Sequence, residues 1–168
     1  MIKPSTIHFI LTGGTIDSYY DGTKDTAVPH KKSVIPNYFK ALQLYEQVKF
    51  TQVCMKDSRQ LTVADVKKIC TTIKKSSSPQ IIITHGTYTM PRTARFLKEK
   101  LPRSDKTIVL TGSMIPLVGF TPSDAGFALG YAMAKVQELP AGVYVCMNGK
   151  TFDPEKVKKN IKKGRFEN

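Results

Sequence analysis

The sequence contains no tryptophan, only three cysteines and half as many acidic as basic residues. Three scattered cysteines are too few for the disulfide framework of a small secreted protein. Cys54, Cys70 and Cys146 stand among apolar residues, so we expect buried free thiols and a cytoplasmic location. Paired Cys and His spacings that would indicate zinc are also absent. The cysteine and histidine spacings therefore predict no zinc site.

Long hydrophobic runs are absent as well. No apolar stretch approaches the ~20 residues that a membrane span needs, and residues 1–5 are too short and too polar for a signal peptide. We therefore predict no membrane association. The 168 residues, of which 40% are hydrophobic, suffice for one domain with its own core, and we place a single domain over residues 1–168.

The basic excess is the unusual property of the composition. Lys and Arg number 26 against 13 Asp and Glu, which gives a formal charge of +13. This charge is compatible with nucleic acid, an anionic surface or an anionic ligand, and it selects none of them. Because 12 of the 26 basic residues precede Tyr88 and 14 follow it, we interpret the charge as a diffuse surface property. We predict no nucleic-acid partner.

Short apolar runs alternate with helix-like stretches along the chain. The runs are rich in Ile and Val, as strands buried on both faces are, and they cover 7–11, 50–54, 81–83, 108–110 and 143–146. We expect helices over 37–45, after a capping box at 62–65, over 89–101, over 121–138 and at the basic run 156–163. Residues 13–35 are predicted to form one long loop. This order predicts a three-layer α/β/α domain with a mostly parallel sheet.

Three of the predicted strands end alike, in Thr followed by Gly and a hydroxyl residue. The three endings are Thr12-Gly13-Gly14-Thr15, Thr84-His85-Gly86-Thr87 and Thr111-Gly112-Ser113. In a parallel sheet these ends share one edge, where ligands bind. Glycines let backbone N–H groups approach a ligand, and hydroxyls supply nucleophiles or hydrogen bonds. Because the sequence has neither a P-loop nor a dinucleotide fingerprint, we predict a different kind of site at this edge.

The segments 12–17 and 84–90 resemble the two signature segments of the bacterial-type L-asparaginase/glutaminase family. Segments 56–62, 110–116, 123–129 and 142–149 resemble further family segments in the same order. The resemblance therefore spans nearly the whole chain. It implies a flavodoxin-like α/β domain and an amidohydrolase that converts L-asparagine to L-aspartate and ammonia without a cofactor.

The resemblance also implies a role for individual residues. Thr15 matches the nucleophile, Thr87 matches a second threonine that activates the attack or the water, and Lys159 matches a lysine hydrogen-bonded to that second threonine. Tyr19 or Tyr20 matches the tyrosine that orients the nucleophile. The sequence does not decide between the two, and Tyr20 is carried here as the catalytic candidate. The implied substrate-binding residues are Gly14, Ser58, Arg59, Gly86, Tyr88 and Ser113.

Other polar residues receive plainer interpretations from the sequence itself. We expect His85 to be a packed neighbour of the site rather than a base, and His8 to be a hydrogen-bonded core residue. We expect His30 to lie on a surface loop. Asp17 and Asp21 are candidates to bind a substrate amino group, but we expect them to be solvated.

The chain departs from the family pattern at two neighbouring points. Tyr88 stands where the family has an aspartate that pairs with the substrate ammonium, and a neutral phenol cannot replace that charge. Arg59 stands where the family usually has a neutral side chain, and a guanidinium favours a more anionic ligand. Either another acid replaces the aspartate, or the substrate lacks the ammonium, or the activity is weak.

A further departure concerns length. The family chain has a second, C-terminal domain that has no counterpart here, and residues 164–168 read as a finished terminus. In the family, that domain helps to close the active site of a neighbouring subunit. We therefore expect a homo-oligomer, a dimer or tetramer, with a different or more open closure of its site.

Two other functions compete with the amidohydrolase. The same pocket would serve a non-catalytic protein that binds an amino acid or a small anion, because Tyr88 has replaced the acid. The basic excess would serve a nucleic-acid or anionic-surface binder. Ammonia release, ligand-induced thermal stabilisation and salt-sensitive retention on a polyanion separate the three.

Overall fold

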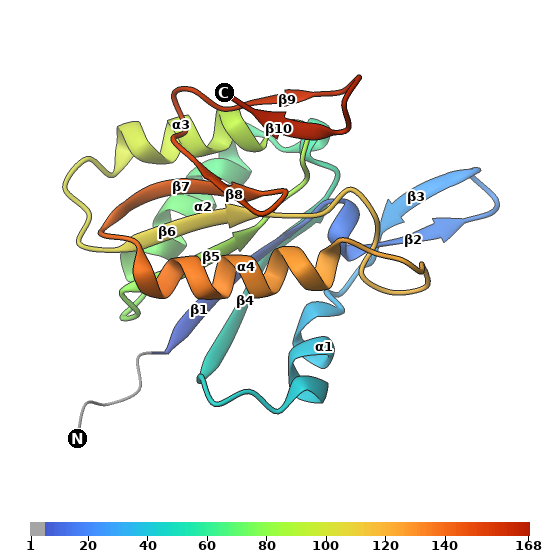
Figure 1. The fold of residues 1–168 in the computed structure, drawn as a ribbon, viewed down its shortest axis with the longest axis horizontal. Helices are drawn as coiled ribbons and strands as arrows, with labels where there is room; N and C mark the ends of the chain where they lie inside the picture. The colour runs from blue at the N-terminus through green and yellow to red at the C-terminus, as the bar shows by residue number, and fades with distance from the viewer. Residues whose placement is uncertain (1–5) are drawn as a thin grey trace.

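In the computed structural model, which describes residues 6–168, a central sheet lies between two pairs of helices (Figure 1). The sheet has the spatial order β4 (Val48–Lys56), β1 (Ile7–Gly13), β5 (Gln80–Thr84), β6 (Thr107–Thr111), β7 (Gly142–Met147) and β8 (Lys150–Phe152). The first five strands are parallel, and β8 is antiparallel to β7. The predicted α/β class and mostly parallel sheet are confirmed, in the strand order of flavodoxin-like folds.

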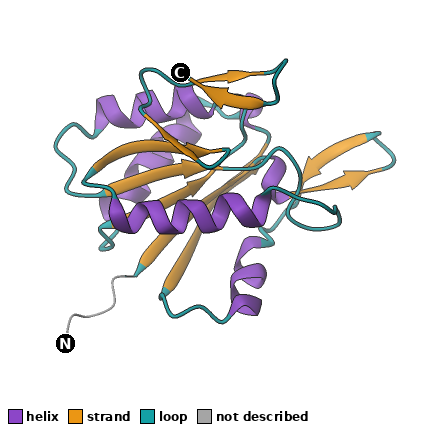
Figure 2. Cartoon of the chain, viewed as in Figure 1, coloured by secondary structure: helices purple, strands orange, loops and turns teal. Residues whose placement is uncertain are grey.

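Helices cover both faces of the sheet, two on each (Figure 2). The first pair is α2 (Val63–Lys75) and α3 (Met90–Lys100), and the second is α1 (Ile35–Leu42) and α4 (Ala125–Glu138). Successive side chains of β1 enter opposite cores, since Ile10 packs with the first pair while Phe9 and Leu11 pack with the second. Burial on both faces explains the continuous apolar runs.

The predicted start is confirmed for α2 and wrong for α4. The Thr62 hydroxyl accepts the Asp65 N–H, and the Asp65 carboxylate accepts the Thr62 N–H, so the predicted capping box is confirmed. The helix predicted from Thr121 instead begins at Ala125, and the Thr121–Pro122 peptide bond is cis. Asp124 is occupied elsewhere, because its carboxylate accepts two backbone N–H groups of the loop after β6.

The segment 13–35 is more ordered than the predicted long loop. It contains the 3-10 turn η1 (Thr15–Asp17) and a hairpin of β2 (Ser18–Asp21) and β3 (Thr26–Pro29). Helix α1 also ends at Leu42 rather than near Tyr45, because Gln43 adopts a left-handed backbone with φ 49°.

The helix predicted at the basic run 156–163 is wrong. Asn148 and Gly149 have positive φ values of 54° and 70°, and their Asn-Gly turn reverses the chain from β7 into β8. A second hairpin follows, formed by β9 (Lys158–Asn160) and β10 (Arg165–Glu167). Figure 1 shows this hairpin close to the start of α3.

The described residues also test the expectations about membrane spans, metal clusters and cysteines. Over residues 6–168, no helix is both long and apolar enough to cross a bilayer. The same residues contain no group of three or more His, Cys, Asp or Glu side chains that could hold a metal ion. The cysteines are free; Cys70 and Cys146 are buried, whereas Cys54 is only half-buried.

Candidate active site

The strand-end threonines tie neighbouring strands together. The Thr12 hydroxyl on β1 donates to the carbonyl of Thr84 on β5 at 2.7 Å. The Thr111 hydroxyl on β6 donates to the carbonyl of Cys146 on β7 at 2.9 Å. These bonds hold the carboxyl ends of β1, β5, β6 and β7 in register, so the three predicted endings do share one edge of the sheet.

Glycines bring the loops after these strands into direct contact. A Cβ on Gly14, whose φ is 80°, would lie 2.4 Å from Gly86 Cα, and a Cβ on Gly86 would lie 2.7 Å from Ser58 Cβ. Only glycine permits such an approach. The loops after β1, β4 and β5 therefore meet backbone to backbone. Thr15 and Thr87 each follow directly after one of the touching glycines.

Thr15 begins η1 with a partly exposed side chain. Among residues 6–168 its hydroxyl has no hydrogen-bond partner. Asp17 anchors the turn η1, because its buried carboxylate accepts hydrogen bonds from the Ser33 hydroxyl and from the Val34 N–H. Burial raises the pKa of Asp17, and these two hydrogen bonds counteract the rise. The expectation that Asp17 is solvated was wrong.

Lys159 reaches Thr87 from the C-terminal hairpin. Its Nζ donates to Thr87 Oγ1 at 2.7 Å, which is the contact that the resemblance implies. Thr87 is 5% exposed. Burial lowers the pKa of Lys159, the Arg59 charge lowers it further, and Asp57 opposes both. A lysine with a lowered pKa beside a hydroxyl is suited to accept a proton.

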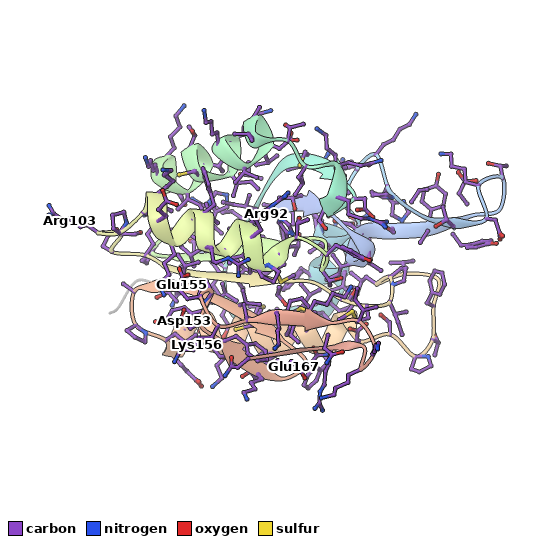
Figure 3. The ribbon with its side chains drawn as sticks, turned by 90° about the horizontal axis from the view of Figure 1, so that it is seen from above. Arg92, Arg103, Asp153, Glu155, Lys156 and Glu167 are labelled. Atoms are coloured by element: carbon purple, nitrogen blue, oxygen red, sulfur yellow. The ribbon has the colours of Figure 1, made fainter. Side chains whose placement is uncertain are left out.

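The hairpin that carries Lys159 is anchored on both sides of this residue. Val157 is buried next to β9, and Phe166, the register partner of Lys159 on β10, is buried in the same core as α3. The Asp153 carboxylate accepts from the Lys98 ammonium of α3 at 2.9 Å. Figure 3 labels Asp153 on the segment that leads from β8 to β9, alongside α3. These contacts hold β9 against the loop after β5.

Tyr88 lies between two cationic side chains. The Arg59 guanidinium carbon is 4.9 Å from the centre of the Tyr88 ring, and Lys159 Nζ is 5.0 Å from it. Arg59 is oriented by Asp57, whose two carboxylate oxygens accept from Nε and Nη2 at 2.9 Å each. The hydrogen bonds from Arg59 lower the pKa of Asp57. Arg59 is thus exposed but not free in solvent.

The two serines of the predicted set are buried. Ser58 Oγ accepts the Thr89 N–H at 3.2 Å, which leaves the Ser58 hydroxyl proton free to donate to a ligand. Ser113 is 1% exposed, and its hydroxyl donates to the Ile115 carbonyl. The proton of Ser113 is therefore used within its own loop. Substrate binding by either serine stays a prediction.

The two tyrosine candidates lie on the β2–β3 hairpin, and the contacts of their rings and hydroxyls are to other residues than Thr15. Tyr20 is 54% exposed and donates its hydroxyl to the Asp25 carboxylate. Tyr19 packs its ring against His30, with centroids 4.9 Å apart. The choice between them stays open, and a catalytic role for Tyr20 stays a prediction.

The other histidines follow the sequence interpretation. His85 is fully buried between the Gly86 carbonyl at 2.7 Å and the Thr93 hydroxyl at 3.0 Å, and burial lowers its pKa to about 4. It is a neutral packed residue. His8 is also buried and bonds the hydroxyls of Ser76 and Thr51.

Sequence reasoning missed Asp57 as a member of the site. It caps the short turn η2 (Ser58–Gln60) by accepting the Arg59 N–H, and it also holds the Arg59 side chain. An Asp two residues before an Arg, directly after a strand, is a usable signal for this arrangement, because Asp side chains bond the backbone two residues on.

Comparisons with known proteins agree with this geometry. Residues 6–165 match the family described as "Asparaginase, N-terminal". The chain is 34% identical over 165 residues to L-asparaginase 2 of Escherichia coli (strain K12), a match that covers 91% of this chain and 46% of that protein. It is 40% identical over 92 residues to Glutaminase-asparaginase of Acinetobacter glutaminasificans, covering 53% of this chain and 27% of that one.

Solved structures give the same result. The probable cytoplasmic L-asparaginase of Campylobacter jejuni superposes with a TM-score of 0.79 at 29% identity and is covered to 52% of its length by 96% of this chain. L-asparaginase I of Vibrio cholerae has a TM-score of 0.82 at 22% identity, with 51% of its length covered by 98% of this chain. The latter likeness concerns the fold alone. The chain spans about half the length of these relatives.

Proposed function

The chain belongs to the asparaginase family, and we propose that it is an L-asparaginase-type amidohydrolase that uses Thr15 as its nucleophile. The observation that carries the proposal is the 2.7 Å hydrogen bond from Lys159 to Thr87. Thr87 directly follows Gly86, which touches Gly14, and Thr15 directly follows Gly14. The hydrogen bond of Lys159 therefore lies close to the Thr15 hydroxyl. Thr15 and Thr87 thus follow two adjacent strands of the sheet, and the C-terminal hairpin supplies Lys159 as the potential proton acceptor.

The reaction has two steps. Thr15 Oγ1 attacks the carbon of a side-chain amide, an ester to Thr15 forms, the C–N bond breaks, and the nitrogen leaves as ammonia with the hydroxyl proton. Water then attacks the ester, which releases the carboxylic acid and restores the Thr15 hydroxyl. Thr87 and Lys159 activate one or both attacks by accepting a proton, because burial and Arg59 favour the neutral amine of Lys159.

Backbone N–H groups supply charge stabilisation. The loop at Gly86 and Thr87 is closed against Ser58 and Gly14 with no space for a side chain at either glycine. Its N–H groups stabilise the oxyanion that forms during attack. One such donor typically contributes about 3 kcal/mol to the stability of the transition state.

A binding protein without turnover is the second candidate, and Tyr88 favours it. The residue that would pair with a substrate ammonium is here a phenol ring 52% exposed between two cations. A ligand could then occupy the site without being positioned for attack. The cytoplasmic location and the homo-oligomer remain proposals in the same way.

Ammonia release separates the two candidates. We expect the wild-type protein to release ammonia from L-asparagine or a related small amide, and Thr15→Ala to lose this activity. Thr23→Ala, which changes an exposed threonine at the tip of the hairpin, serves as the control. If no small amide releases ammonia while the acid products raise the Tm, the proposed amidohydrolase is wrong and the binding protein is the better assignment.

A further inference from the structure

The Tyr88 ring gathers two like charges at the candidate site. Arg59 and Lys159 lie 4.9 Å and 5.0 Å from its centre, because an aromatic face attracts cations. A ligand that enters over Thr87 meets both. An ammonium group on that ligand is repelled, and a carboxylate is attracted.

Asp57, the acid nearest to this pair of cations, is already matched. Both of its carboxylate oxygens accept from the Arg59 guanidinium at 2.9 Å, and one of them also accepts the Arg59 N–H at 2.8 Å. Its charge is therefore balanced by Arg59. The group formed by Asp57, Arg59 and Lys159 carries a net charge of +1 while Lys159 is protonated, and it is neutral when Lys159 acts as the base.

The other acids of these loops are equally occupied. Asp17 accepts from Ser33 and Val34 with its two oxygens, and Asp124 accepts two N–H groups with its own. Asp21 and Asp25 bond within the β2–β3 hairpin. Within residues 6–168, no carboxylate of the loops after β1, β4, β5 and β6 is left without a partner to receive an ammonium.

A groove of about 360 Å³ extends the positive surface from Tyr88 along α3 and β9. Its charged lining residues are all basic: Arg92, Arg95, Lys158 and Lys159. Figure 3 labels Arg92 on α3, where it is exposed. Clefts lined by one sign of charge concentrate ligands of the opposite sign. The groove therefore favours anions beside Tyr88 and Lys159, at the edge of the candidate site.

We propose that the substrate is the terminal amide of a dicarboxylic acid without an α-ammonium group, of which succinamate is the simplest. This inference rests on the proposed amidohydrolase function. The free carboxylate is held at Arg59 and the positive groove, the carbon chain packs on the Tyr88 ring, and the amide points toward Thr15. The reaction follows the two steps of the amidohydrolase: Thr15 forms an ester as ammonia leaves, and water then releases the dicarboxylate.

Competition between two amides tests the substrate class. We expect kcat/KM of the wild type to be at least about tenfold higher for succinamate than for L-asparagine. Tyr88→Asp restores an acid beside Lys159 and should reverse this preference. Tyr88→Phe keeps the ring between the two cations and should retain it. A wild-type preference for L-asparagine overturns the inference while leaving the amidohydrolase intact.

Binding of the acid products gives a test that does not depend on turnover. We expect succinate to raise the Tm of the wild type more than equimolar L-aspartate does, and Tyr88→Asp to invert the order. If neither amide is hydrolysed, the proposed function fails on its own while this comparison still decides the ligand class. Equal effects of the two acids, or a larger effect of L-aspartate, overturn the inference.

Discussion

Lys159 Nζ donates a 2.7 Å hydrogen bond to the Thr87 hydroxyl, across 72 residues of sequence. The contact exists because Val157 and Phe166 are buried beside α3 and hold the β9–β10 hairpin over the end of β5. It joins a group that can accept a proton to a hydroxyl at the edge of the sheet.

Removal of the Lys159 amine should reduce turnover and leave the fold intact. Lys159→Met keeps the length and the apolar stem, so the hairpin remains packed. We expect kcat to fall by about 100-fold or more, as loss of a general base does, with little change in the urea midpoint. Lys162→Met alters an exposed lysine of the same hairpin and should leave kcat unchanged. Equal kcat in both variants would remove Lys159 from the mechanism.

The pH profile should depend on Arg59. Burial and Arg59 lower the pKa of Lys159, so the neutral amine, and with it kcat/KM, should increase with pH along a limb whose midpoint lies below 10.5. Arg59→Gln removes one cause of the lowering and should shift this limb to higher pH. Lys67→Gln on the exposed side of α2 is the matched control. An unshifted limb in Arg59→Gln would show that a different group controls the rate.

Substitution of Gly86 tests the closeness of the three loops. A Cβ at this position meets Ser58 Cβ at 2.7 Å, so Gly86→Ala should lower the free energy of unfolding by about 1–3 kcal/mol. Gly130→Ala on α4 adds a methyl group to open space and should raise stability by about 0.5–1 kcal/mol. Urea unfolding measures both. A neutral Gly86→Ala would mean that the loops are not in contact.

Stability should fall on mild acidification because of two histidines. Burial lowers the pKa of His8 to about 4, with a smaller effect of Lys49, and burial lowers that of His85 to about 4. Below pH 6.5 the unfolded chain therefore binds protons that the folded chain does not, and unfolding becomes easier. We expect a loss of about 2 kcal/mol per histidine between pH 7 and pH 5. His8→Gln should flatten this decrease, and an unchanged slope would contradict the assignment.

The parallel sheet could be predicted because each of its strands is marked by a short apolar run in the sequence. Ile81, Ile82 and Ile83 are all fully buried, as an unbroken apolar run between two turns indicates. The capping box at the start of α2 could also be predicted, because Thr62 and Asp65 are only three residues apart. The resemblance to the family then predicted that Thr15, Thr87 and Lys159 act together, and the contact between Lys159 and Thr87 is present.

The C-terminal hairpin was missed because its basic residues hid its turns. The basic run 156–163 has the composition of an exposed helix face, whereas the hairpin of β9 and β10 turns at residues 161–164, where Gly164 has a φ of 60°. The stacking of Arg59 and Lys159 on Tyr88 was beyond prediction, because three segments distant in sequence must first be placed by the sheet. The buried state of Asp17 likewise depends on Ser33, 16 residues away.

The central claim is that an ester forms on Thr15, and peptide mass mapping tests it most directly. A single turnover with a small amide substrate is quenched rapidly in acid, and the digested protein is analysed for the acyl group. The account predicts that the peptide containing Thr15 gains the mass of the acyl group, while Thr15→Ala shows no gain and releases no ammonia. Ammonia release at the wild-type rate by Thr15→Ala, or an acyl group found on Thr87 instead, would contradict it.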